Sequence, residues 1–221
     1  MESQIECIVR IASSDDHKYA TGITDEMAYS AVKRGTGIPA RTPEYTMKKM
    51  DEGLAVIAVN PQNGEWVGFC CLEVWDHEKY VANSGLIISP EYRGLGISRE
   101  IKMRLFEISR NKFPHAKIFS LSASPAVIHV NEELGYKAIP YAALMKDRWF
   151  VKGCHSWVNF TEMMHHGHAG LNYIAMVFDP ATEAVEPVFS NIGQYFRNKI
   201  KSSGKKKETE VPLKKLGIPY G

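Results

Sequence analysis

The spacing of apolar residues along the chain predicts a series of strands and helices. Ile5, Cys7, Val9 and Ile11 occupy alternating positions, which is typical of a strand over 5–11. Further apolar runs predict strands over 54–59, 65–75, 80–89, 117–121 and 171–178, with an extended segment over 136–144. Helical spacing and capping residues predict helices from about 13 to 33, from Thr42 onward, over 97–112 and over 124–135. This order favours an α/β protein with a mixed sheet and helices on both faces.

The length and the distribution of charge favour one domain followed by a basic extension. A chain of 221 residues is long enough for one large domain with its own core. Apolar periodicity fades after Pro180, and residues 186–221 hold eight Lys or Arg against three Glu. The rest of the chain is slightly acidic, with 19 basic and 22 acidic residues. We therefore predict a domain over 1–180 and a basic, flexible C-terminal extension over 181–221.

Composition and charge argue against several classes of protein. No apolar run approaches the roughly 18 residues of a membrane-spanning helix, so we expect no membrane association. The N-terminus lacks the basic and apolar segments of a secretory signal. The acidic body has no basic stripe, which disfavours specific nucleic-acid binding. Four cysteines are too few for a disulfide scaffold of this length, and they indicate a reducing, cytoplasmic compartment.

The segment with the clearest chemistry lies where the strand over 80–89 leads into the helix that begins near Ile97. Gly94 and Gly96 occupy the connecting turn. Backbone N–H groups at a helix start are unpaired and lie at the positive end of the helix dipole, so they can bind a phosphate without a cationic side chain. Glycines let the anion approach the backbone closely. The alternative is an ordinary strand–turn–helix connection, because short glycine motifs are common.

The sequence around this turn resembles a known acyl-CoA motif. Arg93-x-x-Gly96-x-Ser98, preceded by Leu86-x-Ile88-x-Pro90-x-Tyr92, is similar to the acyl-CoA motif of the GNAT superfamily of N-acyltransferases. Residues 126–136, which end in Leu134-Gly135-Tyr136, resemble the second motif of that family. The resemblance extends over most of the predicted domain. It implies a mixed, mostly antiparallel, twisted sheet with helices on both faces, and CoA-dependent N-acylation.

The resemblance also implies how acetyl-CoA, or another short acyl-CoA such as succinyl-CoA, would bind. The pyrophosphate would contact the backbone of residues 94–98, and the pantetheine arm would pair with backbone near Ile87 and Ile88. Ser124 stands where an Asn often contacts CoA, and Asn131 stands where many relatives carry a Tyr that protonates the CoA thiolate. The implied CoA-binding residues are Ile87, Ile88, Arg93, Gly94, Leu95, Gly96, Ile97, Ser98, Ser124 and Asn131.

A primary amine would attack the thioester directly in such a reaction, and a base must first remove a proton from the ammonium form. Glu73, on the strand before the motif, is the predicted base, acting directly or through a water. Together with Asn131 at the tyrosine position it forms the predicted catalytic pair, although an amide is no acid. The alternative for Glu73 is an outward-facing strand carboxylate. His77 in a turn and His129 on a helix face are weaker candidates for the base.

The predicted acceptor site lies in the basic loop after the first helix. Arg34 and Arg41 could clamp a carboxylate by paired hydrogen bonds, with Glu73 beside them. The alternative is a solvated basic loop. A clamp would select an amino acid, and the segment is similar to a bacterial GNAT subgroup associated with arginine biosynthesis. The expected partner is therefore a small-molecule amine such as glutamate.

Two other functions and one other kind of site remain open from the sequence. Acetylation of a protein lysine or N-terminus is one alternative, and an acyl-CoA-binding sensor without turnover is the other, because Asn131 replaces the tyrosine. We predict no metal, because a group of His and Cys residues does not repeat a known zinc spacing. This group comprises Cys154, His155, His165, His166 and His168. Residues 153–170 are a candidate lid or homodimer contact.

Overall fold

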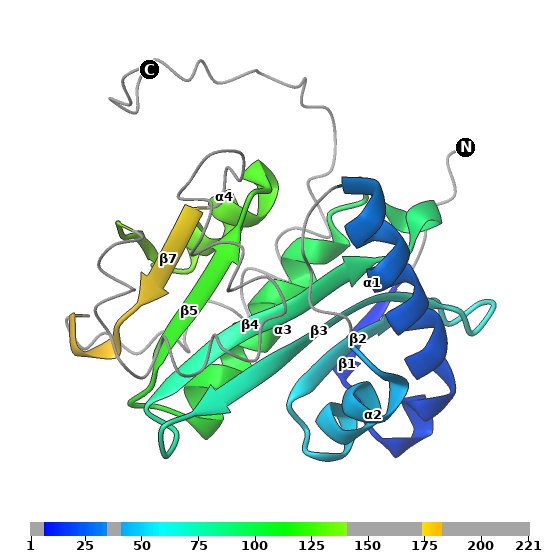
Figure 1. Ribbon diagram of the computed structural model, residues 1–221, viewed down its shortest axis with the longest axis horizontal. Coiled ribbons are helices and arrows are strands. Elements are labelled where there is room, and N and C mark those ends of the chain that lie inside the picture. Colours follow the sequence, from blue (N-terminus) through cyan, green and yellow to red (C-terminus); the bar gives the residue numbers. More distant parts are fainter. Residues whose placement is uncertain (1–6, 35–40, 141–173, 183–221) are drawn as a thin grey trace. The chain divides into compact units, whose positions relative to one another are not determined.

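The computed structural model describes residues 7–34, 41–140 and 174–182 (Figure 1). Within these residues a seven-stranded sheet has the strand order β1-β2-β3-β4-β5-β7-β6. Its strands are β1 (Ile8–Ile11), β2 (Ala55–Val59), β3 (Trp66–Trp75), β4 (Tyr80–Ile88), β5 (Lys117–Ser122), β6 (Lys137–Ala138) and β7 (Ile174–Phe178). All neighbours are antiparallel except β4 and β5, which are parallel. The predicted mixed, mostly antiparallel sheet is confirmed.

Helices cover both faces of this sheet, as predicted. They are α1 (Ala20–Arg34), α2 (Pro43–Asp51), α3 (Ile97–Lys112) and α4 (Pro125–Glu133), with short 3₁₀ helices η1 (Ser14–Tyr19), η2 (Pro90–Tyr92) and η3 (Pro180–Thr182). Ile101 and Leu105 of α3 pack with strand residues in one buried cluster. Ile23 and Met27 of α1 and Met50 of α2 pack in a second cluster on the opposite face. The apolar faces of the helices are thus buried against the sheet, which places its strands between two cores.

The two N-terminal helices begin with different local chemistry. The Thr42 side chain accepts a hydrogen bond from the Tyr45 amide at 3.2 Å and caps α2, whose first residue is Pro43. The segment predicted to start the first helix is instead the 3₁₀ helix η1. There the buried Asp16 carboxylate accepts from both terminal nitrogens of Arg10, at 2.6 and 2.7 Å, and from the Ser13 amide at 2.9 Å. This ion pair with β1 holds the tight turn before α1 begins.

The parallel neighbours β4 and β5 diverge after a short stretch of pairing. Tyr80 to Ala82 lie opposite Lys117 to Phe119, and the register ends there. Beyond this point β4 continues beside β3 as far as Ile88, and β5 continues beside β7 as far as Ser122. The two strands therefore form a V in the middle of the sheet (Figure 1). The N-terminus of α3 follows the open end of β4 through η2 and the turn at residues 93–96.

Some of the sequence predictions fall on the rest of the chain. The predicted C-terminal extension over 181–221 lies outside the described residues except for its first two residues, so its boundary stays a prediction. Residues 153–170, the candidate lid or dimer contact, also lie outside them. None of the helices in the described part of the chain is both long and apolar enough to cross a membrane.

Gly68 of β3 lies under the Ile101 side chain of α3, and it provides a test of the packing of α3 on the sheet. A Cβ at this position would lie 2.6 Å from Ile101 Cδ1 and 2.7 Å from Ile88 Cδ1. We expect Gly68→Ala to lower the free energy of unfolding by about 1–3 kcal/mol, because α3 must move away from β3. Urea unfolding of the two proteins measures this difference.

Gly22→Ala in α1 is the matched control for this substitution. Its added Cβ would meet only the Trp66 side chain, at 3.1 Å, and alanine favours a helix. The free energy of unfolding should therefore fall less than in Gly68→Ala. Equal losses in the two variants would show that Gly68 is not a packing constraint.

Candidate functional site

The apex of the V is the point where the pairing of β4 with β5 ends, after Ala82 and Phe119. It carries a polar cluster on each face of the sheet. Asn83 and Ser84 are the first residues of β4 after its pairing with β5 ends. The Asn83 side chain accepts a hydrogen bond from Lys102 of α3, and the Ser84 side chain accepts one from Arg41, which precedes α2. Successive side chains of a strand point to opposite faces, so Asn83 and Ser84 place one polar side chain on each face of the sheet at the apex.

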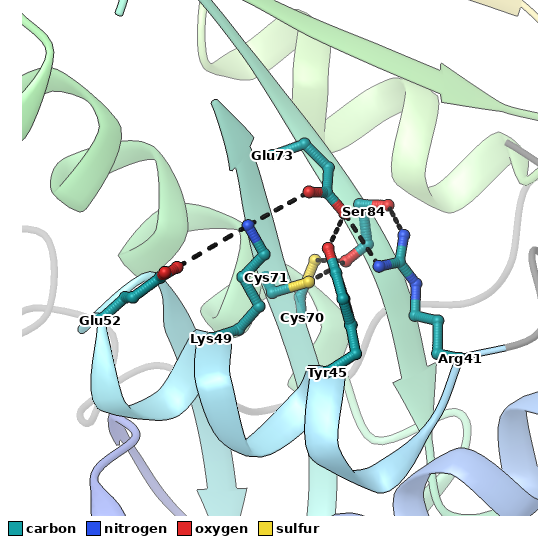
Figure 2. A network of polar contacts seen from close by, with 8 residues as sticks. All are labelled: Arg41, Tyr45, Lys49, Glu52, Cys70, Cys71, Glu73 and Ser84. Atoms are coloured by element: carbon teal, nitrogen blue, oxygen red, sulfur yellow. Dashed lines mark hydrogen bonds and ion pairs between the residues drawn. The ribbon is translucent and has the colours of Figure 1, made fainter. Parts of the chain in front are cut away.

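The cluster on the α2 face is a network of ion pairs centred on Glu73 (Figure 2). Glu73 Oε1 accepts from Arg41 Nη1 at 2.8 Å and from the Tyr45 hydroxyl, and Glu73 Oε2 lies 3.2 Å from Lys49 Nζ. Arg41 Nη2 donates to Ser84 Oγ at 2.5 Å. The side chains of Arg41, Lys49 and Glu73 are 6%, 11% and 20% exposed. Arg41 and Glu73, which were both predicted to bind the acceptor, thus lie side by side. Their charged groups bind each other.

The electrostatics of this network favour the charged form of Glu73. Burial by itself raises the pKa of the Glu73 carboxyl, but the charges of Arg41 and Lys49 and the hydrogen bonds from Tyr45 and Arg41 outweigh it and lower the pKa. Burial and its anionic neighbour Glu73 raise the pKa of the Tyr45 hydroxyl. Lys49 Nζ also lies 4.0 Å from Glu52 Oε2, so the two cations of the cluster face two carboxylates. A general base near neutral pH needs a raised carboxyl pKa, which this environment does not supply. The role of Glu73 as base stays a prediction.

Two buried cysteines lie next to this network, Cys71 in the core cluster of the α2 face and Cys70 in that of the α3 face. The Cys70 and Cys71 thiols donate to the Ser84 carbonyl, at 3.3 and 3.5 Å (Figure 2). That carbonyl lies next to a bulge in β4, where pairing shifts from Phe69 with Ile87 to Cys71 with Ser84, and Gly85 has a φ of 68°. Burial raises the pKa of Cys70 to about 11 and that of Cys71 to about 12. Both are therefore thiols near neutral pH and not nucleophiles.

The glycine turn before α3 has the open backbone that an anion site requires. Gly94 and Gly96 have φ values of 81° and 80°, and no atom lies within 4 Å of a Cβ built on either residue. Among the described residues, none accepts a hydrogen bond from the backbone N–H groups of residues 94–98. The Leu95 side chain is exposed and that of Ile97 is buried in the core, so both residues offer backbone only. The turn thus presents consecutive amides at the start of a 16-residue helix.

Arg93, the first residue of the motif, uses its side chain within the protein. Its Nη2 donates to Glu26 at 2.6 Å and to Ser30 at 3.0 Å, both on α1, and its Nε donates to the Ile88 carbonyl at 3.1 Å. The guanidinium therefore ties α1 to the end of β4. Its predicted contact with CoA stays a prediction.

The backbone of β4 bears on the predicted contact with the pantetheine arm. The Ser89 amide donates to the Val67 carbonyl at 2.9 Å, and Ile87 lies opposite Phe69. Because backbone polar groups alternate along a regular antiparallel strand, those of Ile87 point toward β3 and those of Ile88 point away from it, while Leu86 lies in the bulge. The contact of the pantetheine arm with backbone near Ile87 and Ile88 stays a prediction.

The residues predicted on α4 lie in two different environments. The Asn131 side chain is completely buried and donates to Ser120 Oγ of β5 at 3.0 Å. Its Oδ1 has no hydrogen-bond partner among the described residues. Ser124 is exposed at the start of α4. The exposed His129 faces Glu132 and Glu133 of its own helix, and His77 lies exposed in the β3–β4 turn.

Several predicted residues are not placed by the structure. Arg34 is the last residue of α1, and the loop over 35–40 lies outside the described residues. Cys154 and the four histidines near it also lie outside them. Within the described ranges, His, Cys, Asp and Glu side chains form no group that could hold a metal ion. Residues that the sequence analysis missed are Tyr45, Lys49, Ser84 and Lys102, because no motif marks them and only the fold brings them to the apex.

The pH dependence of stability tests the Glu73 network. Glu73→Gln leaves Arg41 and Lys49 without their carboxylate, and we expect it to lower the free energy of unfolding at pH 7 by about 1–3 kcal/mol. The folded-state pKa of Glu73 is depressed below 4.5, so its contribution is present above that pH and is lost as the pH falls through the folded pKa. Urea unfolding at pH 7 and at lower pH should show the difference between wild type and variant shrinking.

Glu107→Gln removes an (i, i+3) ion pair with Arg104 on α3 and is the control for this measurement. It should change the free energy of unfolding by less than about 0.5 kcal/mol. A loss in Glu73→Gln that stays constant down to low pH would contradict the depressed pKa of Glu73.

Comparison with known proteins identifies the region that carries these features. Residues 27–136 match the model of the Acetyltransferase (GNAT) family. This range runs from α1 to the end of the α4 region and includes the network, the V and the glycine turn. No curated protein matches the chain.

Solved structures share the fold at low sequence identity. Rv2747 from Mycobacterium tuberculosis, in complex with CoA and NLQ, is 16% identical with a TM-score of 0.54, over 78% of this chain and 98% of that one. A GNAT superfamily phosphinothricin acetyltransferase from Sinorhizobium meliloti, in complex with AcCoA, is 16% identical with a TM-score of 0.52, over 84% and 97%. N-acetylglutamate synthase from Neisseria gonorrhoeae, complexed with coenzyme A and N-acetyl-glutamate, is 16% identical with a TM-score of 0.51, over 79% of this chain but only 35% of that one.

Proposed function

The chain belongs to the acetyltransferase (GNAT) family, and we propose that it transfers an acetyl group from acetyl-CoA to the primary amine of a small carboxylated molecule, an amino acid such as glutamate. The observation that carries this proposal is the open V of β4 and β5 ending at a turn of unpaired amides. An acyl-CoA has the matching shape and charge, because it joins an extended amide-containing arm to a diphosphate. Succinyl-CoA is the alternative donor.

The backbone of the glycine turn and of β4 fits a CoA thioester, and this binding needs no cationic side chain at the turn. The amides of residues 94–98 would bind the diphosphate, because they are aligned at the positive end of α3 and the space beside Gly94 and Gly96 is open. The backbone near Ile87 and Ile88 would pair with the amides of the pantetheine arm as a further strand does. This arrangement directs the thioester toward the apex of the V.

The acceptor is inferred from the two cations of the α2-face network. Arg41 and Lys49 are largely buried beside Ser84, and they face Glu73 and the more exposed Glu52. An acceptor carboxylate would accept hydrogen bonds from these two cations, which the ammonium groups of a polyamine could not do. The likeness to the Neisseria gonorrhoeae synthase makes glutamate the first acceptor to test.

In this reaction the network would position the acceptor. Glu73 holds Arg41, Tyr45 and Lys49 in one arrangement, so that the cations face the acceptor carboxylate and its amine lies near the thioester. The amine attacks as the neutral form, and alignment alone contributes much of the acceleration in such bimolecular reactions. Glu73 remains the predicted base for the attacking amine, directly or through a water.

An acyl-CoA sensor without turnover is the competing function, and one observation favours it. Asn131, at the position where the family resemblance implies a tyrosine acid, is fully buried and bonded to Ser120. Release of CoA thiol from acetyl-CoA and from succinyl-CoA, with panels of amino acids, polyamines and peptides, separates the possibilities. Binding without release for every amine would support the sensor, and release only with peptides would support a protein acetyltransferase.

Binding of CoA tests the glycine turn directly. Gly96→Ala places a methyl group in the open space and strains a backbone with φ of 80°. We expect the dissociation constant for CoA to rise at least about tenfold, because the diphosphate can no longer approach the amides. Isothermal calorimetry of CoA binding measures this change.

Gly64→Ala is a closely matched control for Gly96→Ala. Gly64 has a φ of 72° and also has no atom within 4 Å of a Cβ, but it lies in the β2–β3 turn. The backbone strain is therefore similar while CoA binding should be unchanged. Unimpaired CoA binding by Gly96→Ala would show that the diphosphate does not bind at this turn.

Lys49 and its neighbour Lys48 test the acceptor site. Lys49→Met removes a largely buried cation of the network, and Lys48→Met removes an exposed one from the same helix. We expect Lys49→Met to raise KM for glutamate about tenfold or more while KM for acetyl-CoA changes less than about twofold. Lys48→Met should leave both values unchanged. Equal effects of Lys49→Met on both substrates would argue against a carboxylate site.

A further inference from the structure

Lys102 places a buried ammonium group at the apex of the V. It lies on α3, its residue is 2% exposed, and its Nζ donates to Asn83 Oδ1 at 2.5 Å and to Ser120 Oγ at 3.4 Å. Asn83 and Ser120 are the first residues of β4 and β5 beyond the last paired positions, Ala82 and Phe119. The ammonium group therefore spans the two strands at the point where they separate, on the face opposite the Glu73 network.

Within the part of the chain that the structure describes, no anion compensates the charge of Lys102. Among the described residues, no carboxylate forms an ion pair with Lys102 Nζ, and the titratable groups near it are the Cys70 thiol of β3 and the Tyr136 hydroxyl. Burial raises the pKa of both, so both are neutral near neutral pH. The other polar neighbours, Asn83 of β4, Ser120 of β5 and Asn131 of α4, are uncharged. Burial lowers the pKa of Lys102 to about 8.

The neighbours of Lys102 have other hydrogen-bond donors, so they do not explain why a lysine is buried at this position. Asn83 Oδ1 also accepts from the Tyr136 hydroxyl at 3.3 Å, and Ser120 Oγ also accepts from Asn131 Nδ2 at 3.0 Å. An uncharged side chain of the same length would leave both oxygens bonded and would avoid burying a charge. The fully buried Asn131 Oδ1 and the Asn83 Nδ2 beside them have no partner among the described residues. The cluster is thus incomplete as a purely internal network.

We propose that Lys102 donates the proton to the sulfur of CoA as the thioester breaks. This role rests on the proposed function, because it requires the thioester to reach the apex of the V. Neither Asn131 nor Ser120 can supply a proton near neutral pH. Burial raises the pKa of the nearby Tyr136 hydroxyl and Cys70 thiol and lowers that of Lys102, so Lys102 is the strongest acid among the described groups at the apex. Its ammonium group lies on the α3 face, while the acceptor network lies on the α2 face, so acid and acceptor are separated by the sheet.

Acyl transfer forms one bond to the thioester carbon and breaks another. The lone pair of the acceptor amine forms the C–N bond to the thioester carbon, the C–S bond breaks, and its electron pair stays on sulfur. One proton passes from Lys102 Nζ to sulfur, which gives the CoA thiol and a neutral lysine amine. The new amide nitrogen releases its extra proton to water, and Lys102 regains a proton from water. No oxidant, reductant or further reactant is needed.

A test that needs no acceptor is the pKa of the thiol of bound CoA. Thiolate absorbance in the ultraviolet, followed against pH for the complex and for free CoA, measures this pKa. An ordinary alkyl thiol has a pKa of about 8.5, and an adjacent ammonium should lower it by about one unit or more. We expect the lowered thiol pKa in wild type and in Lys102→Arg, and an unshifted or raised one in Lys102→Met. Lys112→Met, at the end of the same helix, should behave as wild type.

Calorimetry with CoA and with desulfo-CoA isolates the contact with sulfur. Near pH 8, where part of Lys102 still carries its proton, Lys102→Met should weaken CoA binding about two- to threefold while leaving desulfo-CoA binding unchanged, because only the thiolate interacts with the ammonium. Should Lys102→Met fail to fold, the wild-type thiol pKa and the wild-type preference for CoA over desulfo-CoA still decide the matter. No lowering of the thiol pKa in wild type overturns the role of Lys102.

Turnover with any amine that releases thiol then distinguishes a proton donor from a fixed charge. We expect kcat to fall about 100-fold or more in both Lys102→Met and Lys102→Arg, because arginine keeps the charge but cannot release a proton. The wild-type fall in kcat above about pH 8 should disappear in both variants. Full activity of Lys102→Arg would overturn the proposal. Failure of wild type to bind CoA would overturn the proposed function as well, whereas bound CoA with an unperturbed thiol overturns Lys102 alone.

Discussion

The separation of β4 from β5 is the constraint on which the site depends. Each strand keeps a partner on its other side, β3 for β4 and β7 for β5, so the sheet stays continuous although its centre opens beyond Ala82 and Phe119. The backbone edges that face the gap are left without a strand between them. In the middle of a sheet, an extended molecule with its own amides is a natural partner for such edges. The shape of the sheet therefore selects the kind of ligand before any side chain contributes.

The glycine turn gives this gap a direction. It lies at the open end of β4, where α3 begins, and amides at a helix N-terminus favour negative charge. A ligand with an anionic end and a reactive end would therefore have the anionic end at the turn and the reactive end toward the apex. Arg93 stabilises the same corner by joining α1 to the Ile88 carbonyl, so the turn is held by the protein while its amides stay open.

The two faces of the sheet at the apex differ in charge compensation. On the α2 face Glu73 binds two cations and a tyrosine, which keeps the carboxylate ionised and the cations fixed. On the α3 face Lys102 has neutral neighbours, and burial lowers its pKa toward neutrality. The first arrangement favours fixed electrostatic recognition, and the second favours proton exchange. One strand serves both because Asn83 and Ser84 are adjacent and point to opposite faces.

Local signals in the amino-acid sequence predicted the helices, the strands and the glycine turn. Apolar spacing predicted α3 with its observed ends, and the Thr42-Pro43 cap predicted the start of α2, because these signals lie within a few residues of one another. Gly94 and Gly96 marked the turn at which an anion site is predicted, and the structure gives both residues the positive φ that glycine adopts readily. Local signals did not predict that Arg41 pairs with Glu73 or that Lys102 lies at the apex of the V. These contacts depend on strand register, on the bulge at Gly85 and on how α3 packs against the sheet, and residues far apart in the sequence set all three.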